Sequence, residues 1–297
     1  MSKRTLYFGN PAKLTTKNEQ VVIRKETTEE SHAPLEDIGL MIFDNTGIIF
    51  SNALIAKCLE YNIGLIFTSN KHLPAGLMLN LDANTIQHER FSAQISAKET
   101  FKNQLWKQII YAKLRNQNQM LSLVFSDDKY LFNLCKKIRS GDASNLEAVG
   151  ARYYWKHLFY PDRFTRNRDG DPPNHLLNYG YTILRAIVAR NLTASGLLPV
   201  LGIHHRNRYN SFPLADDVME PFRPFVDKIV MSLVHGGRGA EDLSPKMKVP
   251  FLQIPNEKVY LDGRSTSLEH AVSKSTASLT KCFTGDEERL SFPSLCK

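Results

Sequence analysis

The sequence of 297 residues changes its hydrophobic pattern near residue 83, and this change restricts the fold more than any other feature. Before that point, short β-branched and aromatic runs alternate with Gly, Asn and Pro turn signals; the runs are 21–23, 38–43 and 63–68. One amphipathic segment, 51–61, begins with Ser51, a favourable helix N-cap. The sequence therefore predicts a β-rich unit with one small helix over residues 1–83.

After that point, apolar residues recur three and four positions apart over long segments rich in helix formers. The segments predicted to be helical are 86–116, 126–140, 146–159, 174–195 and 214–233. The chain is therefore expected to have an α+β fold, with a β-rich domain over 1–83 and a larger helical domain over 84–297. Beyond about residue 265 the sequence is rich in Ser and Thr and weakly periodic, which suits a flexible tail or a segment that folds over a ligand.

The positive charge is concentrated in the second part of the chain. The formal net charge is +8, yet the first 83 residues carry 8 Lys and Arg against 9 Asp and Glu. Because each Lys or Arg placed on a phosphate releases condensed counter-ions, this asymmetry favours a polyanionic partner such as nucleic acid. A basic surface kept for solubility is the alternative.

Targeting and redox signals are sparse. The first residues lack an apolar signal core, and the strongest apolar run, 196–203, is far too short to span a bilayer. The four cysteines are scattered and form no CxxC pair, so neither a disulfide framework nor a zinc ribbon is indicated. We expect a cytoplasmic protein with reduced thiols and no membrane partner.

The sequence contains no GxxxxGK[ST], HExxH or GxSxG motif, so its chemistry must rest on scattered residues. The first candidate is Glu147, near the predicted start of the helix over 146–159. A Glu at this place commonly interacts only with the helix dipole, which is the structural alternative. The aromatic and cationic residues that follow, 152–156, are typical either of a surface for single-stranded nucleic acid or of a helix core.

The second candidate is a polar loop that follows the apolar run 196–203. It begins with His204 and His205 and continues with Arg206 and Arg208. Imidazole is a frequent metal ligand, and guanidinium groups suit phosphate. Because adjacent side chains of an extended segment point in opposite directions, at most one of the two histidines is expected to face a given site.

The third candidate is a pair of acids, Asp217 and Glu220, which share one face of a predicted helix. The alternative is an acidic first turn in which Arg223 is the ion-pair partner of Glu220. Pro221 and Pro224 remove backbone donors and therefore predict a kink or a late helix start. A Glu, a His and a second carboxylate from three elements suit Mg²⁺ or Mn²⁺ better than structural zinc.

Taken together, four segments resemble the CRISPR-associated integrases of spacer acquisition, the Cas1 family, and in particular the short forms that accompany type II systems. The segments, in chain order, are 145–148 (NLEA), 174–181 (NHLLNYGY), 196–205 (GLLPVLGIHH) and 217–224 (DVMEPFRP). The resemblance also includes the strand entry at 34–40 (PLEDIGL) and extends from residue 4 to about residue 255. It implies a β-sandwich-like N-terminal domain, used for dimerisation and DNA positioning, and an all-α catalytic domain.

The resemblance also implies site residues. The catalytic metal ligands fall on Glu147, His205 and Glu220, and Asp217 stands at the place of an auxiliary acid. His205 is at the motif position, three residues after a glycine, whereas His204 stands where the family usually has an apolar residue. Arg206 and Arg208 are DNA-binding candidates, with ordinary surface cations as the alternative.

The implied function is that of an Mg²⁺- or Mn²⁺-dependent DNA endonuclease and integrase, which joins the 3′-hydroxyl ends of captured fragments to repeat phosphodiesters by transesterification. The implied partners are double-stranded DNA, a second copy of the chain and a Cas2 dimer, with room for further CRISPR proteins. Two other functions stay open: a non-catalytic DNA-binding scaffold, and a repair nuclease acting on branched DNA or RNA.

Overall fold

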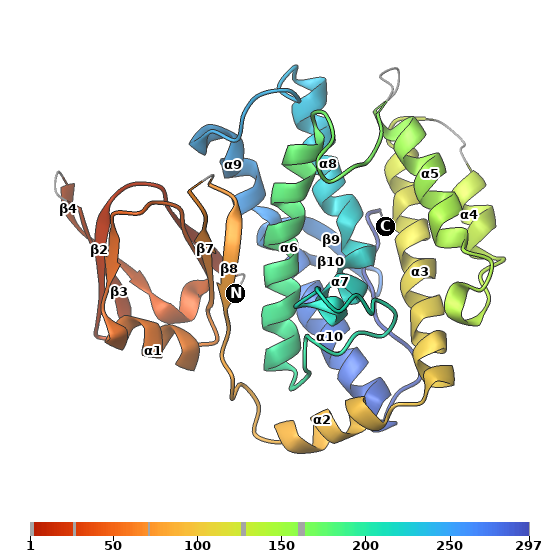
Figure 1. Ribbon diagram of the computed structural model, residues 1–297, viewed down its shortest axis with the longest axis horizontal. Coiled ribbons are helices and arrows are strands. Elements are labelled where there is room, and N and C mark those ends of the chain that lie inside the picture. Colours follow the sequence, from red (N-terminus) through yellow and green to blue (C-terminus); the bar gives the residue numbers. More distant parts are fainter. Residues whose placement is uncertain (1–2, 26–27, 71, 126–128, 160–163, 297) are drawn as a thin grey trace.

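The computed structural model describes residues 3–25, 28–70, 72–125, 129–159 and 164–296. Figure 1 shows most of the strands gathered in the N-terminal part of the chain, together with α1, and mainly helices in the remainder. The fold is therefore mixed α+β, as the change of hydrophobic pattern predicts. The last strand of the N-terminal part ends at Met78, and the first helix after it begins at Gln87.

The described strands of the N-terminal part form two four-stranded sheets. The first has the order β1 (Arg4–Phe8), β5 (Ile38–Phe43), β7 (Gly64–Thr68) and β8 (Pro74–Met78). Its first three strands are parallel, and β8 is antiparallel to β7. The second has the order β4 (Thr28–Pro34), β3 (Gln20–Lys25), β2 (Ala12–Lys17) and β6 (Ile48–Phe50). Helix α1 (Asn52–Glu60) begins after Ser51, whose side chain accepts a hydrogen bond from the Leu54 N–H.

The first sheet is covered on both faces, which explains why every residue of β5 is buried. Met41 of β5 belongs to a core shared with the second sheet and α1. Leu40 and Ile42, which point to the opposite face, belong to the larger core of the helical part. Helix α6 packs against this face (Figure 1). The sheet therefore joins the two parts of the molecule.

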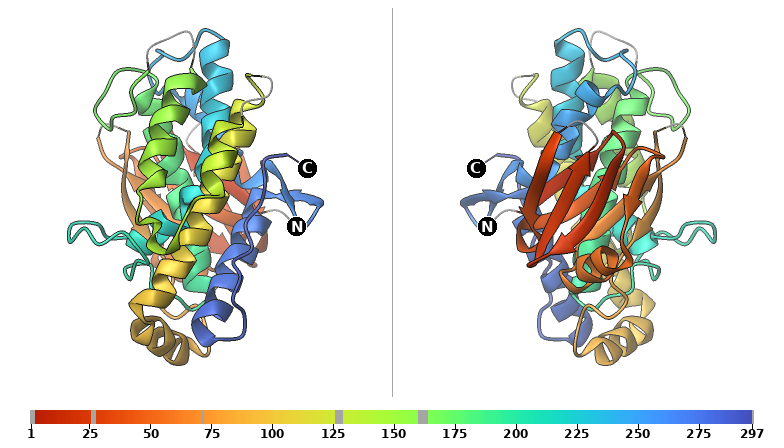
Figure 2. Two further views of the ribbon diagram at one scale, coloured as in Figure 1. Left: turned by 90° about the vertical axis from the view of Figure 1, so that its right-hand side faces the viewer. Right: turned by 90° about the vertical axis from the view of Figure 1, so that its left-hand side faces the viewer.

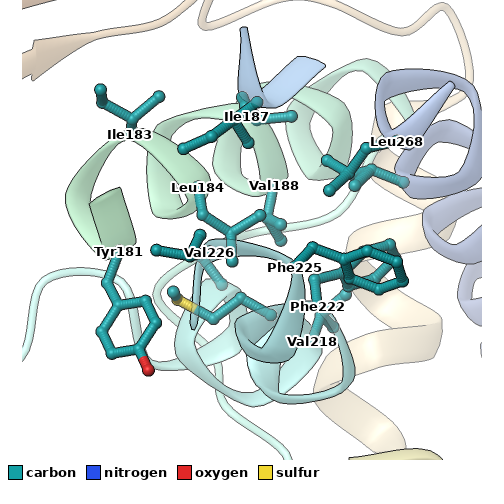
Figure 3. Close-up of a cluster of buried hydrophobic side chains, with 14 of the residues drawn as sticks. Tyr181, Ile183, Leu184, Ile187, Val188, Val218, Phe222, Phe225, Val226 and Leu268 are labelled. Carbon is teal, nitrogen blue, oxygen red and sulfur yellow. The ribbon is translucent and has the colours of Figure 1, made fainter. Parts of the chain in front are cut away.

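The helical part is built around α6, which is buried along most of its length. Its helices are α2 (Gln87–Ser96), α3 (Glu99–Leu121), α4 (Tyr130–Cys135), α5 (Leu146–Leu158), α6 (Asn174–Ala194), α7 (Pro213–Met219), α8 (Arg223–His235), α9 (Pro245–Leu252) and α10 (Leu268–Thr284). Figure 3 shows Leu184 and Val188 of α6 meeting Val226 of α8 in this core. Gly180 allows the close approach, because a Cβ there would lie 2.5 Å from a methyl carbon of Val226.

Two of the predicted helices are divided. The segment 86–116 forms α2 and α3, which are separated at Ala97 and Lys98. The segment 214–233 forms α7, a 3₁₀ turn over Glu220–Phe222, and α8, so the kink predicted from Pro221 and Pro224 is confirmed. Of the segment predicted over 126–140, residues 126–128 lie outside the described residues, and α4 covers 130–135.

The expectation of an all-α second part needs a correction. Strands β9 (Lys258–Leu261) and β10 (Arg264–Ser267) form an antiparallel hairpin. Asp262 and Gly263 make its two-residue turn, with φ of 49° and 75°. An Asp-Gly pair favours this turn because both positions need positive φ. The sequence therefore contained the signal for a hairpin, in an Asp-Gly pair that follows Val259 and Leu261.

The expectation of a flexible tail from about residue 265 is also corrected, because α10 occupies this segment. Its buried face carries Leu268, Val272 and Leu279 at helical spacing, but Ser and Thr fill several positions between them. After α10, residues 288–295 lie along α3, where Gln108 accepts a hydrogen bond from the Leu290 N–H at 2.9 Å. Figure 2 shows this C-terminal segment beside α3.

Within the described residues, none of the helices is both long enough and apolar enough to cross a membrane.

Candidate active site

Glu147 and Glu220 are brought together by a lysine that the sequence analysis did not identify. Lys113 Nζ lies 2.7 Å from Glu147 Oε1 and 2.6 Å from Glu220 Oε2. Lys113 lies on the buried face of α3, and its side chain is 8% exposed. Burial lowers the pKa of Lys113, but the two carboxylates outweigh this effect and raise the pKa above its ordinary value. The available signal was a charged residue on the apolar face of a predicted helix.

Glu147 is free to reach Lys113 because another acid caps its helix. The Asp142 carboxylate accepts hydrogen bonds from the backbone N–H groups of Leu146 and Glu147, both at 2.9 Å. Because Asp142 occupies the capping position, Glu147 does not serve as the cap of this helix.

The aromatic residues of α5 include Tyr154, which is fully buried and donates a hydrogen bond to Asp227. Tyr154 is therefore part of the helix core rather than of an exposed binding surface.

Glu220 is buried between two cations. Arg223 Nε donates a hydrogen bond to Glu220 Oε1 at 2.8 Å, so the ion pair that the sequence suggested as an alternative is present. Burial raises the pKa of Glu220, but Arg223 and Lys113 outweigh burial and lower the pKa below its ordinary range. Glu220 Oε2 is buried and forms a short ion pair with Lys113 Nζ at 2.6 Å.

His205 is oriented by Asp217, which is fully buried. Asp217 accepts hydrogen bonds from the backbone N–H groups of Ile203, His204 and His205 at 2.6, 2.9 and 3.1 Å. His205 Nδ1 lies 2.6 Å from Asp217 Oδ1. Because an ionised carboxylate has no proton to donate, Nδ1 is the donor, and the lone pair of Nε2 is left for another partner. The hydrogen bond that His205 donates to Asp217 raises the pKa of His205.

The two adjacent histidines have different environments. The His204 ring stacks on Trp106, with 4.2 Å between ring centroids and 5° between ring planes. His205 meets the edge of the same indole and contacts Asp217. Gly202 makes this tight loop possible, because a Cβ there would lie 2.5 Å from the His205 carbonyl oxygen. The two rings therefore do not point in opposite directions as an extended segment would predict, since both contact Trp106, but of the two it is His205 that contacts Asp217.

Arg206 and Arg208, the DNA-binding candidates, are both exposed. Arg206 pairs with Glu99, and the Arg208 guanidinium lies 4.6 Å from the ring centroid of Tyr209. Together with Lys102 and His205, both arginines line a hollow of about 360 Å³.

A second basic hollow, of about 750 Å³, lies along α6 and was not predicted from the sequence. Its cationic lining residues are Arg166, Arg168, Arg185 and Arg223. Arg166 is held by the side-chain oxygens of Asn174 and Asn178, and Arg185 pairs with Asp216. The only signal in the sequence was the cluster of arginines in the polar loop before α6. Because Arg223 also contacts Glu220, this hollow reaches the site from the α6 side.

The side chains of Glu147, His205 and Glu220 are a donor set that suits a divalent cation, although the Lys113 ammonium lies between the two carboxylates. In the part of the chain that the structure describes, no group of three or more His, Cys, Asp or Glu side chains is arranged to hold a metal ion. Two carboxylates and an imidazole with a free Nε2 are nevertheless ligands that Mg²⁺ and Mn²⁺ accept. Glu220 Oε2 supports the same fit, because it is buried and its charge needs a nearby cation.

Comparison with known families identifies the chain. The family model described as CRISPR associated protein Cas1 matches residues 6–253. This chain belongs to the Cas1 family. The CRISPR-associated endonuclease Cas1 of Neisseria meningitidis serogroup C is 35% identical over 94% of this chain and 91% of the relative. A Cas1 endonuclease of Saccharolobus solfataricus is 29% identical over 81% of this chain and 73% of the relative.

Solved structures share the fold of this Cas1 chain. A casposase bound to its integration product has a TM-score of 0.76 at 21% identity, covering 98% of this chain and 92% of that one. A Cas1 protein from Thermotoga maritima has a TM-score of 0.75 at 18% identity, covering 95% and 98%. A chain from a partial Cas6-RT-Cas1–Cas2 complex has a TM-score of 0.65 at 18% identity, covering 99% and 100%. At these identities the likeness shows the fold alone.

Proposed function

We propose that this Cas1 chain is a divalent-metal-dependent DNA endonuclease and integrase of CRISPR adaptation. The observation that carries the proposal is the meeting of Glu147 and Glu220 at one cation, Lys113 Nζ. The charged form of His205 also lowers the pKa of Glu220, so His205 belongs to the same electrostatic cluster. The names of the curated relatives, which are CRISPR-associated endonucleases, support the same activity.

Each residue then has a defined role. Glu147, His205 and Glu220 would hold Mg²⁺ or Mn²⁺, which would supply a Lewis acid for phosphoryl transfer between a DNA hydroxyl and a phosphodiester. Asp217 acts through His205, because it fixes the ring orientation and keeps the proton on Nδ1. Arg223 keeps Glu220 ionised and orients its carboxylate.

The two basic hollows support DNA binding at this site. One reaches His205 and contains Arg206 and Arg208, whereas the other reaches Arg223 and contains Arg166 and Arg168. Joining needs two DNA segments at one centre, one with a 3′-hydroxyl and one with the phosphodiester under attack. Two separate phosphate-binding surfaces suit this requirement. With water as the attacking group, the same site would act as a nuclease.

The proposal includes an assembly. A homodimer, a Cas2 dimer and double-stranded DNA are the proposed partners, and the complex leaves room for further CRISPR proteins. In support, structural neighbours of this chain include a Cas1–Cas2 complex and a casposase on its integration product. The β-rich N-terminal part is proposed to provide dimerisation and DNA positioning.

The test is an integration assay with the full chain, its Cas2 companion, a short duplex with free 3′-hydroxyl ends and a supercoiled plasmid that carries repeats. Wild type, Glu220→Gln and the control Glu89→Gln, an exposed acid on α2, are compared in Mg²⁺, Mn²⁺ and EDTA. We expect metal-dependent joining in wild type and Glu89→Gln and none in Glu220→Gln. DNA binding without joining in any metal would instead favour a scaffold, and preferred cleavage of branched DNA or RNA would favour a repair nuclease.

A further inference from the structure

Lys113 is buried more deeply than a lysine usually is. Its residue is 6% exposed and lies in the middle of α3, one position before the fully buried Leu114. Lysine is almost never buried to this degree unless its charge is paired. Its acidic partners come from two other elements, since Glu147 lies on α5 and Glu220 on the 3₁₀ turn after α7.

The ammonium lies between the oxygens that the proposed function assigns to a divalent cation. Its distances of 2.7 Å to Glu147 Oε1 and 2.6 Å to Glu220 Oε2 leave no room for a second cation between these atoms. The contact with Glu147 Oε1 is a directed hydrogen bond, and the contact with the buried Glu220 Oε2 is a short ion pair. A divalent cation between the two carboxylates would have to replace both contacts.

We propose that Lys113 is an internal counter-ion of the site, which a divalent cation must displace from between Glu147 and Glu220 in order to bind. This inference rests on the proposed metal site. In the metal-free chain, the Lys113 ammonium compensates the negative charges of Glu147 and Glu220. Because Glu220 is buried, the loss of part of this compensation would cost free energy. In the metal-bound chain, the ammonium and the metal repel each other at short range. Lys113 therefore stabilises the metal-free protein and weakens metal binding.

Removal of the charge separates these two effects. Lys113→Met keeps an unbranched side chain that ends one atom short of the ammonium, and Lys113→Arg keeps the charge. We expect Lys113→Met to bind Mn²⁺ about tenfold more tightly than wild type or better, because one repelling charge is absent. We expect the Mn²⁺ affinity of Lys113→Arg to stay near that of wild type. The metal-free Lys113→Met protein should have a lower melting temperature, which Mn²⁺ raises by more than it does for wild type.

The experiment is a calorimetric titration of the full chain with MnCl₂, together with thermal unfolding in EDTA and in Mn²⁺. The matched control is Lys107→Met, which removes the same charge from an exposed position on the same helix. Lys113→Gln is a second neutral variant. Tighter Mn²⁺ binding in both neutral Lys113 variants, with Lys107→Met and Lys113→Arg unchanged, supports the proposal.

Equal or weaker Mn²⁺ binding in the folded neutral variants would overturn it, and so would tighter binding in Lys113→Arg. If the neutral variants unfold in EDTA, recovery of the fold in Mn²⁺ supports the proposal, and failure to recover overturns it. Glu220→Gln identifies the site that the titration reports. If Glu220→Gln binds Mn²⁺ as tightly as wild type does, the proposed metal site itself is wrong. If Glu220→Gln loses Mn²⁺ binding while Lys113→Met has the same Mn²⁺ affinity as wild type, only the counter-ion role of Lys113 is wrong.

Discussion

Lys248 and Asp44 form a buried ion pair that joins the helical part of the molecule to the N-terminal sheets. Lys248 Nζ, on α9, lies 2.6 Å from Asp44 Oδ2, just after β5, and the side chains are only 2% and 1% exposed. Asp44 also accepts hydrogen bonds from Tyr7 and from Thr68, the latter at 2.8 Å. The hydrogen bonds from Tyr7, Thr68 and His72 come from the N-terminal part, whereas Lys248 supplies a hydrogen bond and a counter-charge from across the boundary.

Substitution of Lys248 by Met should therefore be strongly destabilising. The Asp44 carboxylate would stay buried without its counter-charge, which costs about 3–5 kcal/mol of unfolding free energy. Urea unfolding followed by circular dichroism measures the loss. The double variant Asp44→Asn/Lys248→Met should recover part of it, because no buried charge remains; a loss below about 1 kcal/mol in the single variant would contradict the importance of the pair.

Asp44 should also contribute to acid sensitivity. Burial by itself would raise the pKa of Asp44, but hydrogen bonds from Lys248, Tyr7, Thr68 and His72 outweigh burial and lower the pKa below its ordinary value of 3.8. A carboxyl group with a lowered folded-state pKa stabilises the protein above its unfolded-state pKa, and this contribution is lost as the pH falls through the folded-state value. Unfolding free energies measured from pH 7 to pH 3 should therefore fall more steeply below about pH 4 in wild type than in Asp44→Asn. Parallel curves would show that Asp44 does not titrate in this way.

Asp217→Asn should weaken metal binding through His205. The amide presents an N–H group to a loop that supplies only N–H donors, so the contacts with residues 203–205 and with His205 Nδ1 cannot all form. We expect a loss of about 10–100-fold in Mn²⁺ affinity, measured by calorimetry. Asp216→Asn is the matched control, because Asp216 is a buried neighbour on α7 that pairs with Arg185 instead. An equal loss in both variants would argue for a general effect of charge.

The two histidines should respond differently to the same substitution. His204→Phe keeps an aromatic ring on Trp106, so we expect Mn²⁺ affinity and strand joining within about threefold of wild type. His205→Phe removes the nitrogen that the site needs, so Mn²⁺ binding should fall by at least about tenfold. Parallel calorimetric titrations of the two variants make the comparison. Loss in His204→Phe alone would reassign the ligand to His204.

Short-range patterns predicted the main elements well. The continuous apolar run of β5 and the helical spacing of α5 and α6 are local properties, and the structure confirms all three elements. The kink between α7 and α8 was also predictable, because proline removes backbone donors wherever it stands. Helix α10 was missed because Ser and Thr occupy much of its buried face, and they are accommodated there by hydrogen bonds such as that from Thr280 to the Ser195 carbonyl oxygen at 3.0 Å.

The sequence by itself indicated the family, because the four segments that carry the resemblance are local runs of residue identities, and the candidate ligands followed from that resemblance. Only the tertiary structure decided that Lys113 lies between Glu147 and Glu220, and that Lys248 compensates Asp44. Whether a charge is buried, and what compensates it, depends on side chains supplied by elements far apart in the chain. The partners of these ion pairs are separated by 34 to 204 positions, and no local pattern records such contacts.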